Sequence, residues 1–418
     1  MAITISQRLQ RFVSSAKLEH SFFLLVGVFL VVLPLPNTVS LRLTALAGIA
    51  LMAAVMLRRG AMPPFPLKIP LLLWAGLALL SLLWARDTNY SLGEVKNEIL
   101  YTLLAFFVFF SQTRDDARWN RWMGWLWLAA GIAVVGALMA WRRGDMAGNV
   151  RYLYPGVGAF TTFVVSVFPF LLLSLINPRL SRYRKLLGSV ILSLMLVAAF
   201  YSRNRMFWLA LSASSLVLLG LLAARAKNLT HRRLFLVAVI GLCAISIVTL
   251  LALVSIRSQA IGVSLGTLVE QTAITDPRLT TIWQFVVTHF WDQPWTGLGF
   301  GLHTFNNAYP ELARINPAFW HPHNLFLHYS MQLGVFGVLV LVLLFGAIVR
   351  QLWRAYRDPD MQIMRVGAAG MALVAGVLTK NMTDVFFYRE NALLFWSLLG
   401  MTFGYAAYRR QQRAQEAG

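Results

Sequence analysis

The sequence predicts an all-α, polytopic membrane protein. Of its 418 residues, 58% are hydrophobic and only 13% are charged, about half the charged share of an average soluble protein. Apolar stretches of roughly 17–25 residues, each long enough to cross a bilayer as a helix, recur along the whole chain. Only helices and closed barrels satisfy the polar backbone inside lipid, so we expect a helical bundle.

Twelve apolar segments make up the predicted bundle. They are 21–36, 39–57, 69–85, 97–112, 120–141, 157–176, 186–202, 205–224, 233–254, 324–350, 363–380 and 390–408. An even number of crossings places both termini on one side of the membrane. We therefore predict nine transmembrane helices within 21–254, three within 324–408, and one large segment, 255–323, between the two groups.

Positive charge predicts the orientation of the bundle. The loops on the side of the termini hold 24 of the 37 Lys and Arg, an excess typical of cytoplasmic loops. We expect residues 1–20 to form a basic amphipathic helix on the inner membrane surface, and 409–418 to be a cytoplasmic tail. Segment 255–323 then faces outward. The formal charge of +21 is spread over these loops instead of being clustered, which argues against nucleic-acid binding.

Segment 255–323 is expected to be partly helical. Residues 279–287 have the apolar spacing of a helix, and Asp276-Pro277 is a typical helix start. Residues 293–301 are rich in glycine, which permits positive φ angles and close backbone approach. No Gly-Lys-Ser/Thr follows them, so they do not form a phosphate-binding loop of that type.

The segment ends in His321-Pro322-His323-Asn324, the residues best suited to catalysis. The ordinary pKa of histidine lies near neutrality, so we predict His323 as a general base and His321 as a substrate-binding neighbour. Asn324 is expected to cap the following helix, whose first amides also attract anions. Histidines satisfied by backbone carbonyls are the structural alternative. A metal site is disfavoured because no Asp, Glu or Cys accompanies the pair in the sequence.

Arginines supply candidate binding sites for an anion. Arg203 and Arg205 lie in a short outward hinge between two apolar segments, and Arg278 lies at the start of the outer helix. Guanidinium stays charged and matches the geometry of phosphate oxygens. Lipid headgroups or loop carbonyls are the alternative partners.

A second outward turn carries Asp384 and Arg389. We expect Asp384 either to orient a histidine or to pair with Arg389, and a structural ion pair is favoured. Arg389 is also a candidate substrate-binding residue. One base-like histidine, several guanidiniums and no evident metal cluster suit a reaction in which a phosphate-linked lipid loses its diphosphate, with arginines neutralising the leaving oxygen.

These residues resemble a known family. His323-Asn324, followed after nine residues by Gly334-Val335-Phe336-Gly337, is similar to the His-(Asn/Ser/Gln)-x9-Gly-x-x-Gly motif of the O-antigen ligase family. Arg278 ahead of Trp283, with Pro294 and the glycines of 297–301 after it, also resembles the outer-loop signature of that superfamily, as does Ser202-Arg203 at its hinge.

The resemblance implies a GT-C type glycosyltransferase in a Gram-negative inner membrane, with its active site facing the periplasm. Such a ligase moves O-antigen polysaccharide from undecaprenyl diphosphate to the lipid A–core oligosaccharide, without a metal or other cofactor. Carried over, His323 deprotonates an acceptor sugar hydroxyl, Arg203 and Arg278 bind the donor diphosphate, and Asp384 supports the site. Direct attack by the hydroxyl predicts inversion at the anomeric carbon.

Two other functions stay open. An O-linked protein oligosaccharyltransferase or an O-antigen polymerase would keep the chemistry and change the acceptor. Those relatives often carry extra outer segments or a soluble C-terminal domain, so we expect the ligase here. A lipid-linked sugar flippase would require charged residues in helix middles, whereas the predicted helix interiors are almost purely apolar.

Overall fold

The bundle is entirely helical in the part of the chain that the computed structural model describes, which is residues 16–57, 62–144, 153–178, 180–226, 228–261, 278–385 and 387–417. Eight of the described helices are long and apolar enough to cross a membrane. They are α3 (Val39–Leu57), α7 (Asp116–Arg142), α8 (Val157–Leu175), α9 (Arg182–Tyr201), α10 (Arg205–Ala224), α11 (Leu229–Ile261), α16 (Leu325–Tyr356) and α17 (Met361–Lys380). The predicted class, an all-α polytopic membrane protein, is confirmed.

Each of the other four predicted segments also coincides with a helix. They correspond to α2 (Ala16–Val32), α4 (Lys68–Leu80) with the 3-10 turn η1 (Ser81–Leu83), α6 (Tyr101–Gln112) after the π-helical turn η2 (Val95–Leu100), and α18 (Arg389–Ala417). How many of the twelve cross the membrane stays a prediction.

Several helix ends differ from the predicted bounds, including the start of α2 and the ends of α11 and α18. α2 already begins at Ala16, and most of the amphipathic helix expected over 1–20 lies outside the described residues. α11 continues to Ile261 and α18 to Ala417. Polar residues after an apolar run can remain helical in water, so hydropathy alone marks these ends too early.

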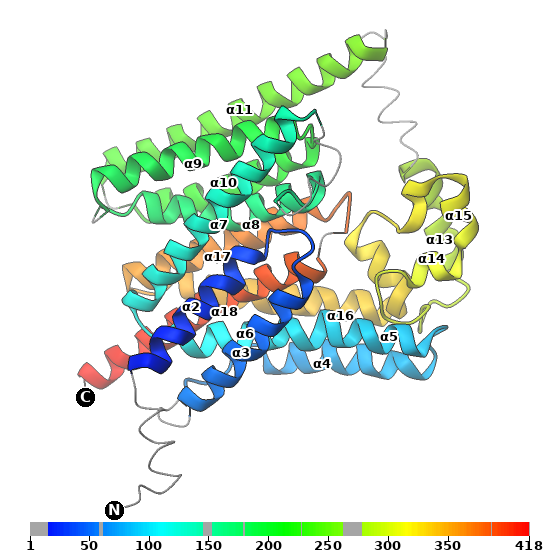
Figure 1. Cartoon of the computed structure of the whole chain (residues 1–418), viewed down its shortest axis with the longest axis horizontal. Coiled ribbons are helices and arrows are strands. Elements are labelled where there is room, and N and C mark those ends of the chain that lie inside the picture. Colours follow the sequence, from blue (N-terminus) through cyan, green and yellow to red (C-terminus); the bar gives the residue numbers. More distant parts are fainter. Residues whose placement is uncertain are drawn as a thin grey trace, which may run out of the picture.

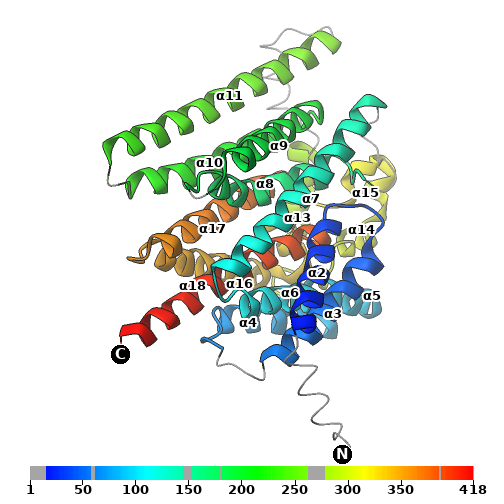
Figure 2. The same cartoon turned by 60° about the vertical axis from the view of Figure 1, so that its left-hand side comes forward.

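The start of α2 and the last part of α18, the first and last described helices, lie at one end of the bundle. Near the start of α2, Glu19 pairs with Arg118 of α7 at 2.6 Å. Near the end of α18, Arg409 pairs with Asp116, also of α7, at 3.2 Å. The two ion pairs place these helix ends beside the start of α7, as expected for termini on the same side. Figures 1 and 2 show α11 along the outside of the bundle, where it packs on α10.

The outer segment gathers at the other end of the molecule, beside α16 and the short helix α5 (Thr88–Glu94), as Figure 1 shows. Its described helices are η3 (Arg278–Trp283), α13 (Gln284–Phe290), α14 (Thr304–Ala308), α15 (Pro310–Ile315) and η4 (Pro317–Trp320). The helix predicted over 279–287 is confirmed, and the segment has a small apolar core of its own that includes Ile282, Val286 and Phe305.

Two glycines dock the outer segment onto α16. Gly297 and Gly334 each have a φ of +64°. A Cβ on Gly297 would lie 2.5 Å from the carbonyl carbon of Gln332, and a Cβ on Gly334 would lie 2.5 Å from that of Trp295. The close approach allows backbone hydrogen bonds from Leu298 and Gly299 to α16 carbonyls, 2.8 and 2.9 Å long. The non-helical φ/ψ of Gly334 kinks α16 there, so the helix begins with a separate arm, 325–333.

Candidate active site

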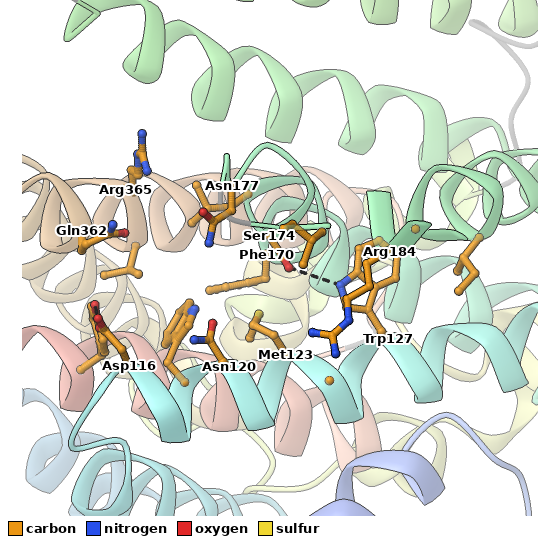
Figure 3. A pocket seen from close by; sticks show the side chains of 18 of the residues that line it. Asp116, Asn120, Met123, Trp127, Phe170, Ser174, Asn177, Arg184, Gln362 and Arg365 are labelled. Atoms are coloured by element: carbon orange, nitrogen blue, oxygen red, sulfur yellow. Dashed lines mark hydrogen bonds between the residues drawn. The ribbon is translucent and has the colours of Figure 1, made fainter. Parts of the chain in front are cut away.

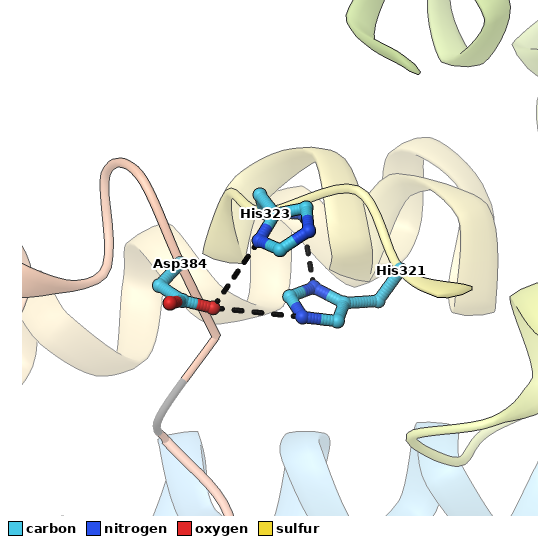
Figure 4. A group of neighbouring side chains, drawn as sticks. All are labelled: His321, His323 and Asp384. Atoms are coloured by element: carbon cyan, nitrogen blue, oxygen red, sulfur yellow. Dashed lines mark hydrogen bonds and ion pairs between the residues drawn. The ribbon is translucent and has the colours of Figure 1, made fainter. Parts of the chain in front are cut away.

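Two histidines and an aspartate form a cluster where the outer segment joins α16 (Figure 4). Nε2 of His321 lies 3.5 Å from Oδ1 of Asp384, and Nδ1 of His323 lies 3.4 Å from the same oxygen. The backbone N–H of His323 donates to Nδ1 of His321 at 3.0 Å. The His321 and His323 side chains are 3% and 11% exposed, and that of Asp384 is 26% exposed. The cluster is thus shielded but reachable from outside.

The start of α16 holds the histidine segment against the turn that carries Asp384. The side-chain oxygen of Asn324 accepts from the amides of Phe326 and Leu327, so the predicted cap is confirmed. Its Nδ2 donates to the carbonyl of Met382 at 3.0 Å, and the amide of Leu325 donates to the carbonyl of Asn381. These hydrogen bonds hold the start of α16 against the turn after α17, close to the histidines and Asp384.

The outer helix fixes the histidine segment from the other side. The indole N–H of Trp283 donates to the carbonyl of Pro322 at 2.9 Å. His323 itself has a φ of +52°, a left-handed conformation that costs a non-glycine residue about 1–2 kcal/mol. The surrounding hydrogen bonds offset this cost, and the unusual backbone directs the imidazole toward Asp384 (Figure 4).

The electrostatics of the cluster favour an ionised aspartate. Burial raises the pKa of Asp384, but the hydrogen bond with His323 and the nearby His321 and Lys380 outweigh burial and bring the pKa below its ordinary value. A carboxylate facing Nδ1 of His323 favours the tautomer with the proton on that atom. The lone pair then lies on Nε2, which is the arrangement that a general base requires.

The neighbouring imidazole has the opposite tautomer. Nδ1 of His321 accepts the His323 amide hydrogen bond, so neutral His321 carries its proton on Nε2, facing Asp384 at 3.5 Å. The geometry therefore distinguishes the two histidines. His321 supports the backbone of His323, and His323 is the better placed base.

The expected ion pair between Asp384 and Arg389 is wrong. Within the described residues, the ion-pair partners of Asp384 are the two histidines. The backbone N–H of Arg389 donates to both oxygens of Glu98, at 2.8 and 3.1 Å, and its guanidinium lies 5.9 Å from the ring of Tyr388. A φ of +47° at Arg389 turns the chain there and separates its side chain from Asp384.

The other arginines lie on separate elements. Arg203 is exposed and occupies the turn between α9 and α10 with a φ of +54°. Arg205 is the first residue of α10. Asn204 caps α10 and donates to Thr161 of α8 at 3.2 Å, which fixes the turn. Arg278 begins η3, and its side chain lies outside the described part of the structure.

The cluster also has the composition of a metal site. Its three ligand atoms lie within 4.8 Å of one another. The sequence places no acid beside the histidines, but the fold brings Asp384 to them from 61 positions beyond His323. The expectation that no acid accompanies the two histidines is therefore wrong. Imidazole nitrogens and a carboxylate are a donor set that zinc accepts.

Several residues that position the site were not recognised from the sequence. Tyr90 and Glu94 of α5 accept hydrogen bonds from the amides of His303 and Leu302, and Gln332 accepts one from Gly301. Glu98 is 8% exposed and anchors Arg389. Residues 87–98 are a polar stretch between two apolar segments. This stretch is the sequence feature that could have indicated Tyr90, Glu94 and Glu98.

One comparison with known proteins finds a family match over part of the chain. The family model of the O-antigen ligases matches residues 190–342, from α9 through the hinge, the outer segment and the histidine segment to the first half of α16. No curated protein matches the chain. Members of this family are ligase- or polymerase-type glycosyltransferases, which supports a transferase that uses a lipid-linked polysaccharide. Residues 190–342, which include His323, Asn324, Gly334 and Gly337, therefore match the family model of the O-antigen ligases.

Proposed function

We propose that the protein is an O-antigen ligase. It transfers O-antigen polysaccharide from undecaprenyl diphosphate to the lipid A–core oligosaccharide, at the periplasmic face of a Gram-negative inner membrane. The observation that carries the proposal is the contact of Asp384 with Nδ1 of His323, the histidine that lies in the part of the chain matched by the family model. In this proposal both chain termini face the cytoplasm.

His323 acts as the base. A sugar hydroxyl is a weak nucleophile, and a positioned imidazole raises the rate by roughly 10²–10⁴-fold when it accepts the proton. Ionised Asp384 holds the ring and stabilises the imidazolium that forms. The hydroxyl oxygen bonds to the anomeric carbon while the bond to the diphosphate breaks, so the configuration inverts.

Arginines bind the donor. Arg203, Arg205 and Arg278 contact the diphosphate, and they neutralise the charge that develops on the leaving oxygen. Asn324 and Arg389 are further substrate-binding residues in this proposal, and the reaction needs no metal. The polyprenyl tail stays in the bilayer.

The test uses purified full-length protein, a polyprenyl-diphosphate glycan and core lipid. His323→Ala is expected to reduce transfer by roughly 10²–10⁴-fold, and chelator is expected to leave the wild-type rate unchanged. His289→Ala is the matched control, because His289 is also in the outer segment but bonds the carbonyl of Phe285. Wild-type transfer by His323→Ala would remove the base from the mechanism.

The donor site and the acceptor are tested separately. Arg203→Ala should weaken donor binding, whereas Arg182→Ala, an exposed arginine at the other end of α9, should not. Supplying core lipid, a serine-containing peptide or a second lipid-linked glycan as acceptor distinguishes ligase, protein oligosaccharyltransferase and polymerase. Product on the peptide or the glycan alone would overturn the ligase proposal in favour of the corresponding relative.

A further inference from the structure

A cavity of about 610 Å³ lies between α7, α8, α9 and α17 (Figure 3). It is at the end of the bundle that holds the end of α18, since Tyr405 and the first turns of α7 and α17 line it. Along α17, Arg365 and Lys380 are 15 residues apart, which corresponds to about 22 Å. The cavity is therefore remote from the histidine cluster, and its volume is that of a site for a small molecule or part of a lipid.

The cavity is positively charged. Arg184 and Arg365 line it at opposite ends (Figure 3), and neither has an ion pair within the described residues. The one carboxylate among its described lining residues is Asp116, which already binds Arg409 and the hydroxyl of Tyr405. Uncompensated guanidiniums beside a membrane suit an anionic group.

The wall between the arginines has a polar and an apolar part. Asn120 and Asn177 line it with their amide side chains, and Ser174 accepts a hydrogen bond of 3.4 Å from the indole of Trp127. Phe170, Met123, Leu173 and Ile191 make up much of the rest. Such a wall accommodates a molecule with a polar head and a hydrocarbon portion.

The mouth of the cavity is continuous with the surface that faces lipid. Leu187 lines the cavity and is 48% exposed, and its neighbours on α9, Leu186 and Val190, are 65% and 47% exposed. Gly124 of α7 lines the cavity as well, with no atom within 4 Å of the place where its Cβ would stand. A hydrocarbon chain can therefore leave the cavity between α7 and α9 into the bilayer.

We propose that this cavity binds an anionic phospholipid of the leaflet on the side of the termini. The headgroup phosphate binds the guanidinium of Arg184 or Arg365, the amide of Asn120 binds a remaining headgroup oxygen, and an acyl chain passes Leu187. The lipid joins α9 to α7 and α17.

Native mass spectrometry of delipidated full-length protein tests the proposal. We expect one phosphatidylglycerol to be retained, and retention of phosphatidylcholine to be several-fold lower. The double variant Arg184→Gln/Arg365→Gln should lose this preference. The charge-matched control Arg182→Gln/Arg350→Gln, which changes exposed arginines that do not line the cavity, should keep it. Equal retention of the two lipids by the wild type would overturn the proposal.

A second variant covers the case in which the arginine variant does not fold. Gly124→Leu should fill the cavity and displace the lipid, whereas Gly131→Leu, at another uncrowded glycine of α7 outside the cavity, should not. Thermal unfolding separates a lipid from a free anion. Phosphatidylglycerol should raise the unfolding temperature and inorganic phosphate at the same concentration should not. Equal stabilisation by inorganic phosphate, or full retention by Gly124→Leu, would contradict a lipid site.

Discussion

The backbone N–H of His323 donates to Nδ1 of His321 at 3.0 Å, so the first histidine holds the main chain of the second. Asn presents its side-chain oxygen close to the position of Nδ1 and can accept the same bond, whereas Leu cannot. We expect His321→Asn to keep kcat within about tenfold of wild type and His321→Leu to lose roughly another tenfold, the value of one hydrogen bond. Equal kcat values for the two variants, measured in the transfer assay, would show that this bond does not matter.

Asp384 is expected to set the tautomer of His323. Asp384→Asn keeps the shape but removes the charge, and its amide can stabilise the wrong tautomer. We predict that kcat falls by roughly 10²–10⁴-fold, with little change in KM. Asp360→Asn, a carboxylate at the other end of α17, is the matched control and should leave kcat unchanged. A fall in Asp384→Asn that appears only in KM would indicate a substrate-binding role.

The paired glycines should matter for stability. Gly334→Ala places a Cβ 2.5 Å from the carbonyl carbon of Trp295 at a positive φ. Backbone strain and overpacking together should lower the free energy of unfolding by about 2–4 kcal/mol. Gly346→Ala is the control, because this glycine of α16 has no atom within 4 Å of a Cβ, and it should be neutral or stabilising. Thermal unfolding of the purified variants measures the difference, and equal unfolding temperatures would contradict the docking role.

Asp360 should make part of the stability dependent on pH. Burial raises its pKa, but the hydrogen bonds from Arg409 and from the amides of Gln362 and Ile363 outweigh burial and lower it. A depressed pKa contributes stability that is present above the unfolded value of about 3.9 and is lost as the pH falls through the folded value. The difference in unfolding temperature between wild type and Asp360→Asn should be constant from about pH 6 to 8 and shrink below about pH 4. A difference in unfolding temperature that grows as the pH falls would contradict a lowered pKa for Asp360.

Zinc is expected to inhibit transfer. Two zinc ligands at about 2.0–2.1 Å in tetrahedral geometry lie roughly 3.3 Å apart, close to the 3.4 and 3.5 Å between Asp384 and the two histidines. Bound zinc would occupy Nδ1 of His323 and remove Asp384 from its role. Chelator should restore the full rate, and Asp384→Asn should bind zinc more weakly by equilibrium dialysis. Undiminished transfer at saturating zinc would exclude this effect.

Local features were predictable from the sequence. Length and hydropathy gave all twelve helical segments, and residue type gave the Asn324 cap and the positive φ angles of the outer-segment glycines. Each depends on neighbours within a few positions. The role of Gly334 was not predictable, since it depends on a loop some 40 residues earlier.

Long-range pairings were the part that could not be predicted. Asp384 has a histidine 61 positions before it and an arginine 5 positions after it, and sequence proximity favoured the wrong partner. Glu98 likewise binds a backbone 291 positions away. The proposed lipid cavity is lined by side chains of five helices, α7, α8, α9, α17 and α18, and no local pattern in any one of them predicts it.

The left-handed backbone of His323 means that thermostability and catalysis place different demands on this position. Glycine adopts that conformation without strain, so a substitution that relaxes the loop would also remove the proposed base. Selection of variants for heat resistance alone would therefore tend to discard the imidazole. A more thermostable variant should therefore keep His323 and carry its stabilising substitutions in the helices at the opposite end of the bundle.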